Sequence, residues 1–251
     1  MTEAEWMAFT DPWELIEHIA GPTERIRGPQ GTMRCVIATD RQCLLWGSAC
    51  CRRLGPFIDD ARWLNAIRIV EQFAEGEATY SQVLAVGGEM EKWFQELGNY
   101  ESCTPASMVA RSCADLSSGV DSAFDSMRTP FVSPAYDASR WAVAAVREYA
   151  GEQAAERERA VQCALLHDIL GNPFRPATVR EEWKTATVVA LAEEIYLGRS
   201  FGRLPELATV LTQAGCDNEF ILNHCQSDGP HVRGCWVVDL FRRVEDQLRW
   251  S

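Results

Sequence analysis

The chain has 251 residues, 47% of them hydrophobic, which is enough for one sizeable core or for two smaller ones. Its formal net charge of −12 opposes contact with phosphate backbones, so no direct nucleic-acid binding is expected. No apolar run is long enough for a membrane-spanning helix, and the acidic N-terminus lacks the features of a signal peptide. We therefore expect a cytoplasmic protein without membrane association.

Helical periodicity dominates the first hundred residues. Asp11, followed by Pro12 at the first helical position, is typical of a helix start. Asp40 begins a stronger pattern that Pro56 ends. The β-branched segment 33–40 could be briefly extended, but it is too isolated to predict a sheet. The helices predicted in this part cover residues 11–20, 40–54, 60–79 and 80–98.

Residues 99–136 are the least regular part, rich in Ser, Thr and Pro, with one short helix expected near residues 108–116. Asp137 then begins a long helical pattern that can break at Gly151 and stops at Gly171. The remaining predicted helices cover residues 181–199, 201–216, 218–226 and 231–250.

These elements predict an all-α fold, a non-repeating multi-helix bundle. Two helical lobes, 1–98 and 137–251, could be joined by the irregular connector 99–136, which would then be a hinge. One continuous domain is the alternative.

The ten cysteines are many for a chain expected in the cytoplasm, where disulfides are rare. Their scattered spacing indicates small, reduced core residues. Cys50 and Cys51 precede two arginines, which can lower a thiol pKa, so a redox-responsive thiol is an alternative.

The segment HCQSDGPHVRGCW, residues 224–236, holds two of the chain's four histidines and two cysteines. His231 and Cys235 are four residues apart, the spacing that places two side chains on one face of a helix. Zinc takes about four nitrogen or sulfur ligands. The candidate ligands are Cys216, His224, Cys225, His231 and Cys235. The alternative is a helical hairpin whose histidines bond the backbone and whose cysteines lie in the core.

Two other motifs allow a functional interpretation. The His167–Asp168 dipeptide matches only a fragment of the metal-dependent phosphohydrolases of the HD class, and we interpret His167 as a helix-end residue. The turns GNPFRP and HVRGCW carry Arg175 and Arg233, which could clamp a helix junction by pairing with Asp168 and Asp239 or could contact a ligand.

Six segments carry a family resemblance: TEAEW, DPWELIEHI, CLLWGSACCRRL, GNPFRP, LPELATVLTQAGC and HVRGCWVVDL. Together they resemble an uncharacterised bacterial family of paralogous hypothetical proteins. The resemblance covers most of the chain and implies no known activity. Similar proteins are expected to have an arginine at His167, whereas the five Cys and His positions named above match. The resemblance thus favours a shared structural or metal-binding role for those five.

The leading hypothesis is a non-catalytic adaptor or regulatory protein that acts through contacts with another protein, without a cofactor. Nine tryptophans are many for a core of this size, and tryptophan is enriched at binding hot spots. Trp6, Trp13 and Trp250, near the termini, are the expected exposed contacts. The alternative is a zinc-dependent hydrolase, or a zinc-stabilised protein, that uses the C-terminal Cys/His cluster.

Overall fold

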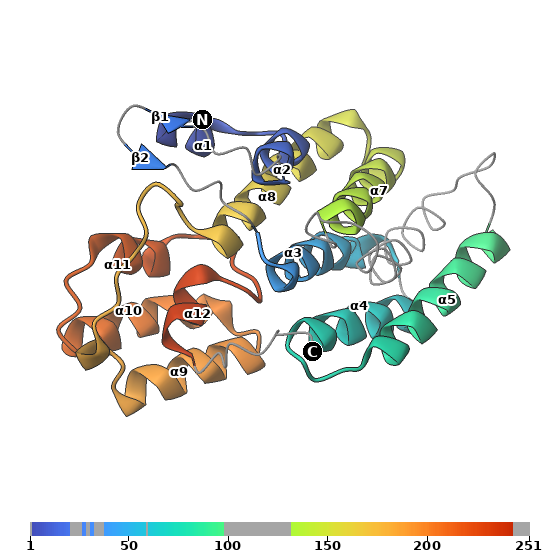
Figure 1. Ribbon diagram of the computed structural model, residues 1–251. Coiled ribbons are helices and arrows are strands. Elements are labelled where there is room, and N and C mark those ends of the chain that lie inside the picture. Colours follow the sequence, from blue (N-terminus) through green and yellow to red (C-terminus); the bar gives the residue numbers. More distant parts are fainter. Residues whose placement is uncertain are drawn as a thin grey trace. The chain divides into compact units, whose positions relative to one another are not determined.

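The computed structural model describes residues 2–20, 27–28, 31–32, 38–58, 60–97 and 132–242 (Figure 1). The chain divides into two compact units, Met1–Cys163 and Ala164–Ser251, and the division falls within helix α8 (Glu152–Leu170). Over the ranges described, none of the helices has the length and apolarity needed to span a bilayer. The connector predicted over residues 99–136 stays a prediction for residues 99–131, which lie outside the described ranges, whereas residues 132–136 are helical.

The first unit is built around helix α3 (Asp40–Arg52), which packs against α4 (Ala61–Ala74) and α7 (Val132–Ala150). Thr39 and Gln42 form a capping box that begins α3, and Asp60 caps α4. The unit also contains α1 (Glu3–Ala8), α2 (Pro12–Ala20), η1 (Gly55–Phe57), α5 (Tyr80–Leu97) and a two-residue antiparallel pair, β1 (Arg27–Gly28) with β2 (Gly31–Thr32).

Helix α3 is tied to its neighbours by buried polar contacts. The Trp46 indole Nε1 donates to the Gln162 carbonyl of α8 over 3.1 Å. Arg53, just after α3, makes a bidentate ion pair with the buried Glu158, through Nε at 2.9 Å from Oε1 and Nη2 at 2.8 Å from Oε2. Burial raises the pKa of the Cys50 thiol well above its usual range, so Cys50 is a core residue and not a reactive thiolate.

The second unit is a compact set of short helices (Figure 1). It contains the end of α8, η2 (Glu181–Trp183), α9 (Ala186–Leu197), η3 (Phe201–Arg203), α10 (Leu204–Gln213), α11 (Glu219–Gln226) and α12 (Trp236–Phe241). Helix α10 contacts both α9 and α11, and α12 contacts α9. Thr185 caps α9 and Asn218 caps α11 through their side-chain oxygens.

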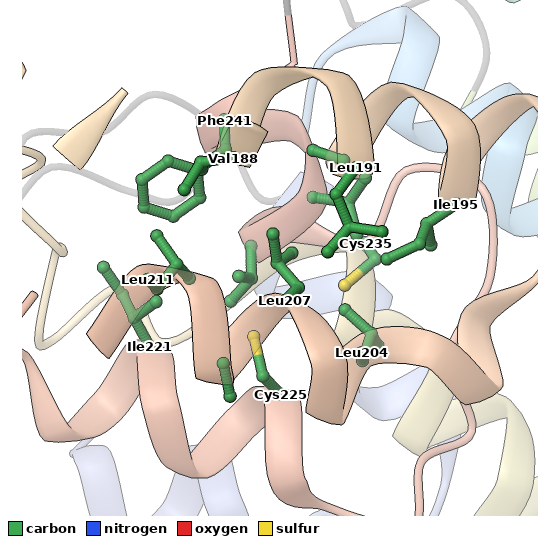
Figure 2. Close-up of a cluster of buried hydrophobic side chains, with 14 of the residues drawn as sticks. Val188, Leu191, Ile195, Leu204, Leu207, Leu211, Ile221, Cys225, Cys235 and Phe241 are labelled. Carbon is green, nitrogen blue, oxygen red and sulfur yellow. The ribbon is translucent and has the colours of Figure 1, made fainter. Parts of the chain in front are cut away.

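The core of the second unit lies between α9, α10, α11 and α12 (Figure 2). Leu207, Leu211 and Ile221 are fully buried there. Cys225 and Cys235 reach the same core, and both are free thiols. Cys235 therefore belongs to the apolar core although it stands at the edge of a polar cluster.

The all-α prediction is confirmed, whereas several predicted helix limits are wrong. The long helix begins at Val132 instead of Asp137, and Gly151, at a φ of +84°, separates α7 from α8. The last helix begins at Trp236 rather than at residue 231. Residues 181–199 form η2 and α9 instead of one helix. The predicted segments 33–37 and 108–116 lie outside the described residues.

The fold predicts a contrast between two leucines of the second unit. Leu207 is 0% exposed and Leu197 is 57% exposed. Leu207→Ala should lower the free energy of unfolding by about 2–5 kcal/mol, because it removes core contacts and leaves a cavity. Leu197→Ala should change it by less than about 0.5 kcal/mol. Urea unfolding of the two variants measures the difference, and equal losses would contradict the position assigned to α10.

Candidate metal centre

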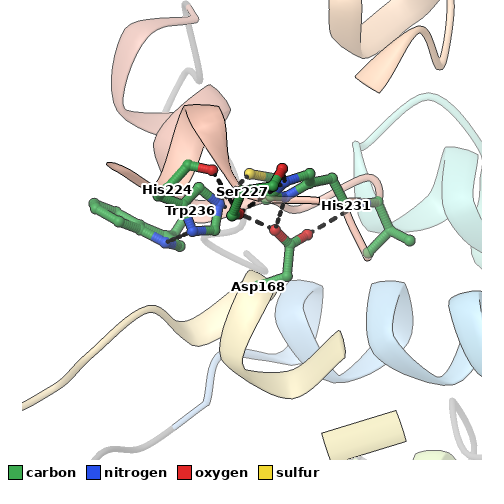
Figure 3. Close-up of polar contacts among 7 residues, drawn as sticks. Asp168, His224, Ser227, His231 and Trp236 are labelled. Carbon is green, nitrogen blue, oxygen red and sulfur yellow. Dashed lines mark hydrogen bonds and ion pairs between the residues drawn. The ribbon is translucent and has the colours of Figure 1, made fainter. Parts of the chain in front are cut away.

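Four side chains with metal-ligating atoms converge in the second unit (Figure 3). Asp168 comes from the last turn of α8, His224 from the last turn of α11, and His231 and Cys235 from the loop that leads into α12. One potential ligand atom from each residue lies within 4.8 Å of the others. Asp168 and Cys235 are buried, with the Asp168 side chain 2% exposed, whereas His224 and His231 are partly buried.

Asp168 occupies a position that helix electrostatics disfavour. A carboxylate in the last turn of a helix meets the negative end of the helix dipole. Gly171, at a φ of +67°, directly follows Leu170 and ends α8. Because glycine has no side chain, the Trp236 ring can approach this position, where a Cβ would lie 3.2 Å from Cγ of Trp236. The carboxylate therefore depends on donors that come from outside α8.

The loop between α11 and α12 supplies those donors. The Val232 backbone N–H donates to Oδ2 of Asp168 over 2.9 Å. Nδ1 of His231 lies 2.7 Å from Oδ1, and Nε2 of His224 lies 3.1 Å from the same oxygen. Nε2 of His224 is also 3.2 Å from Sγ of Cys235. The one carboxylate thus joins both histidines and the loop backbone.

The partners of each histidine indicate where its protons lie. His231 faces the Asp168 carboxylate through Nδ1 and the Ser227 carbonyl through Nε2, at 3.2 Å. Both of these oxygens only accept, so both nitrogens of His231 carry hydrogens. The Trp236 indole N–H donates to Nδ1 of His224 over 3.1 Å, which leaves the hydrogen of a neutral His224 on Nε2.

The cluster shifts the pKa values of its members. Burial alone would raise the pKa of Asp168, but hydrogen bonds and charge from His224 and His231 outweigh it and lower that pKa. Burial alone would lower the pKa of His231, but the hydrogen bond and charge of Asp168 raise it overall. Burial raises the pKa of the Cys235 thiol well above its usual range. Asp168 and His231 therefore form an ion pair beside a protonated thiol.

The spacing of the cluster is close to that of a metal coordination shell. Zinc bonds of about 2.0–2.3 Å to nitrogen, oxygen and sulfur imply tetrahedral edges of about 3.3–3.8 Å. The two contacts of His224 Nε2, at 3.1 Å and 3.2 Å, are slightly shorter than such edges, and the His231–Asp168 contact is 2.7 Å. To hold an ion, these three short contacts would lengthen by up to about half an ångström, and the widest separation in the set, which reaches 4.8 Å, would shorten. This His/Cys/Asp cluster could hold a metal ion.

A second arrangement at the same place resembles a nucleophilic triad. Ser227 Oγ lies 3.3 Å from Nε2 of His231, whose Nδ1 meets Asp168. However, the Ser227 hydroxyl donates to the His224 carbonyl over 2.8 Å, and Nε2 of His231 donates to the Ser227 carbonyl. A general base needs a free lone pair at that nitrogen. The arrangement therefore does not support a serine hydrolase.

The five predicted zinc ligands divide into two groups. His224, His231 and Cys235 lie in the cluster, whereas Cys216 and Cys225 lie in the apolar core. The prediction that His231 and Cys235 share a helical face is wrong, because both residues precede α12. Asp168 was missed as a ligand. Its signal was a carboxylate placed at the wrong end of a predicted helix, just before Gly171.

The predicted clamp residues have other partners. Among the described residues, Asp168 is held by the two histidines and the Val232 backbone and by no arginine. Asp239 pairs with Arg242 at 3.5 Å. Arg175 lies over the Phe220 ring at 4.9 Å, and Arg233 lies over the Tyr196 ring at 5.3 Å.

The predicted exposed tryptophans are corrected in part. Trp6 is fully buried, so it is not a surface contact. Trp13 is half-buried and donates to Ser139 Oγ over 3.1 Å, which makes it a structural link within the first unit. Trp250 lies outside the described residues.

Comparisons of the chain with protein-family models, curated proteins and solved structures found no match. The predicted resemblance to a bacterial family stays a prediction. The geometry of the cluster therefore carries the functional argument.

The ion pair predicts a pH dependence for protein kept free of metal. The lowered pKa of Asp168 gives stability that is present above its unfolded pKa of about 3.9 and is lost on acidification. The raised pKa of His231 gives stability that is full below its unfolded pKa of about 6.5 and is lost as the pH rises through the folded value. The contribution should be largest between these two values.

Urea unfolding in the presence of a chelator measures this dependence. The stability difference between wild type and His231→Gln should be larger near about pH 5.5 than near about pH 8.5. The comparison with the variant removes the contributions of groups outside the cluster. The same difference at both pH values would contradict the ion pair.

Proposed function

We propose that Asp168, His224, His231 and Cys235 bind one Zn²⁺ ion that stabilises the second unit, and that the protein is a zinc-stabilised, non-catalytic protein. The observation that carries the proposal is the convergence of four ligand atoms within 4.8 Å, two from buried and two from partly buried residues. They come from three separate parts of the fold, so an ion held by all four would join α8, α11 and the loop before α12.

The donor types and their charges support zinc. Two imidazoles, one thiolate and one carboxylate form a set that suits Zn²⁺, which binds nitrogen, sulfur and oxygen in a tetrahedron. The Asp168 carboxylate and a Cys235 thiolate together neutralise the two positive charges of the ion. Neutrality matters here because both side chains are buried, and an uncompensated charge would be costly. The thiol proton of Cys235 would leave to solvent on binding.

A structural role is favoured over a zinc-dependent hydrolase. Catalytic zinc sites keep one coordination position open for water or substrate, whereas structural sites use four protein ligands. Here four protein ligands are available, and the most exposed of them, His224, has a side chain that is 17% exposed. The hypothesis that the protein works through contacts with another protein in the cytoplasm is compatible with this role. Trp6 does not support that hypothesis, because its side chain is buried.

The direct test is the zinc content of untagged protein, combined with its stability with and without chelator. We expect one zinc per chain and a melting temperature that falls on chelation. Free zinc a hundredfold above its Kd should add about 2.7 kcal/mol to the free energy of unfolding. Protein that binds no zinc on reconstitution would refute the proposal.

A pair of cysteine variants separates loss of the metal from loss of core packing. Cys235 and Cys225 are both 0% exposed in the same core, but only Cys235 belongs to the cluster. Cys235→Ala should abolish stoichiometric zinc binding, and Cys225→Ala should retain it despite a lower melting temperature. Equal zinc contents in the two variants would show that the metal lies elsewhere.

A further inference from the structure

Trp236 makes a contact that bears directly on metal binding. Its indole Nε1 lies 3.1 Å from Nδ1 of His224, and the two rings are tilted by 60° (Figure 3). An indole N–H can only donate, so Nδ1 of His224 must offer its lone pair. The hydrogen of the neutral imidazole then sits on Nε2, the nitrogen that faces Asp168 and Cys235.

Ligation requires the opposite arrangement at His224. A neutral histidine that binds a metal through Nε2 carries its hydrogen on Nδ1, and it usually donates that hydrogen to a carbonyl or carboxylate. At His224, a hydrogen on Nδ1 would point at the indole N–H of Trp236, and two donors would face each other. The indole must therefore give up its hydrogen bond before Nε2 can bind an ion.

His231 has no such conflict. Its Nε2–H donates to the Ser227 carbonyl over 3.2 Å, which is the outer contact that a metal-binding histidine needs. Loss of the Nδ1 hydrogen alone would free a lone pair toward the cluster. The two histidines therefore differ, because the outer partner of His231 supports ligation and the outer partner of His224 opposes it.

Packing holds Trp236 in this position. The glycine at position 171 lets the indole approach the end of α8, where any Cβ would lie 3.2 Å from Cγ of Trp236. Trp236 also packs against the core of the second unit and forms the first residue of α12. The indole consequently competes with the metal for His224 from a fixed place.

We propose that Trp236 weakens zinc binding by holding His224 in the tautomer that cannot ligate, and that zinc binding breaks the Trp236–His224 hydrogen bond. This inference rests on the proposed zinc site. Trp236 would then lower the zinc affinity of the site. Outer partners of metal ligands usually raise the affinity, so that their removal weakens binding.

The test is the zinc Kd of full-length wild type, Trp236→Phe and Trp183→Phe, measured by competition with a chromogenic chelator. Phenylalanine keeps an aromatic ring but cannot donate. Trp183 is the matched control, because it is 2% exposed in the same core and its Nε1 has no hydrogen-bond partner among the described residues. Trp236→Phe should bind zinc about threefold to tenfold more tightly, and Trp183→Phe should bind as wild type does.

The outcomes separate the two proposals. A Trp236→Phe protein that binds zinc as wild type does, or more weakly, overturns the role of Trp236 and leaves the zinc site standing. If wild type and both variants fail to bind zinc, the zinc site falls and the inference falls with it.

A second measurement avoids substitutions at position 236. In ¹H–¹⁵N spectra of the wild-type protein, zinc should move the Trp236 indole resonance toward that of an indole without a hydrogen bond. The Trp183 resonance should stay in place. A Trp236 indole that remains hydrogen-bonded in zinc-loaded protein would overturn the inference.

Discussion

The buried carboxylate of Asp168 is the constraint on which the second unit depends. It lies at the end of α8 where the helix dipole opposes a negative charge, and its side chain is 2% exposed. Burial at such a place is tolerated only with strong compensation. The backbone of Val232 and the imidazoles of His224 and His231 provide it. The loop before α12 therefore has to lie against the end of α8, and the short helices of the second unit place it there.

The polar cluster and the apolar core are adjacent and share one residue. Cys235 touches both, because its sulfur lies 3.2 Å from His224 while the residue is buried beside the leucines of the core (Figure 2). The cluster can be neutral in two ways: as an Asp168–His231 ion pair with a thiol, or as a carboxylate and a thiolate around Zn²⁺. Trp236 favours the first through His224. The outer contacts of the two histidines thus influence the balance between the protonated form and the metal-bound form of the cluster.

The sequence allowed the fold class to be predicted but only part of the site. The apolar periodicity of α3, α4, α5 and α10 and the stop at Gly171 are local signals, and they sufficed for an all-α fold. The thirteen residues 224–236 identified three of the four clustered side chains, since histidine and cysteine are rare enough in a short loop to be informative. Asp168 lies 63 residues before His231, and no local pattern joins them. Cys216 and Cys225 were assigned to the same site because composition cannot distinguish a ligand thiol from a core thiol. All three thiols lie in the apolar core, and only Cys235 also lies beside Asp168 and the two histidines.

The central claim, that these four side chains bind one zinc ion, is tested most directly by X-ray absorption spectroscopy of zinc-loaded protein. We expect a four-coordinate ion with one sulfur at about 2.3 Å and three nitrogen or oxygen ligands at about 2.0–2.2 Å. The sulfur should vanish in Cys235→Ala. A shell of nitrogen and oxygen without sulfur, or with two or more sulfurs, would contradict the assignment of Asp168, His224, His231 and Cys235 as the ligands.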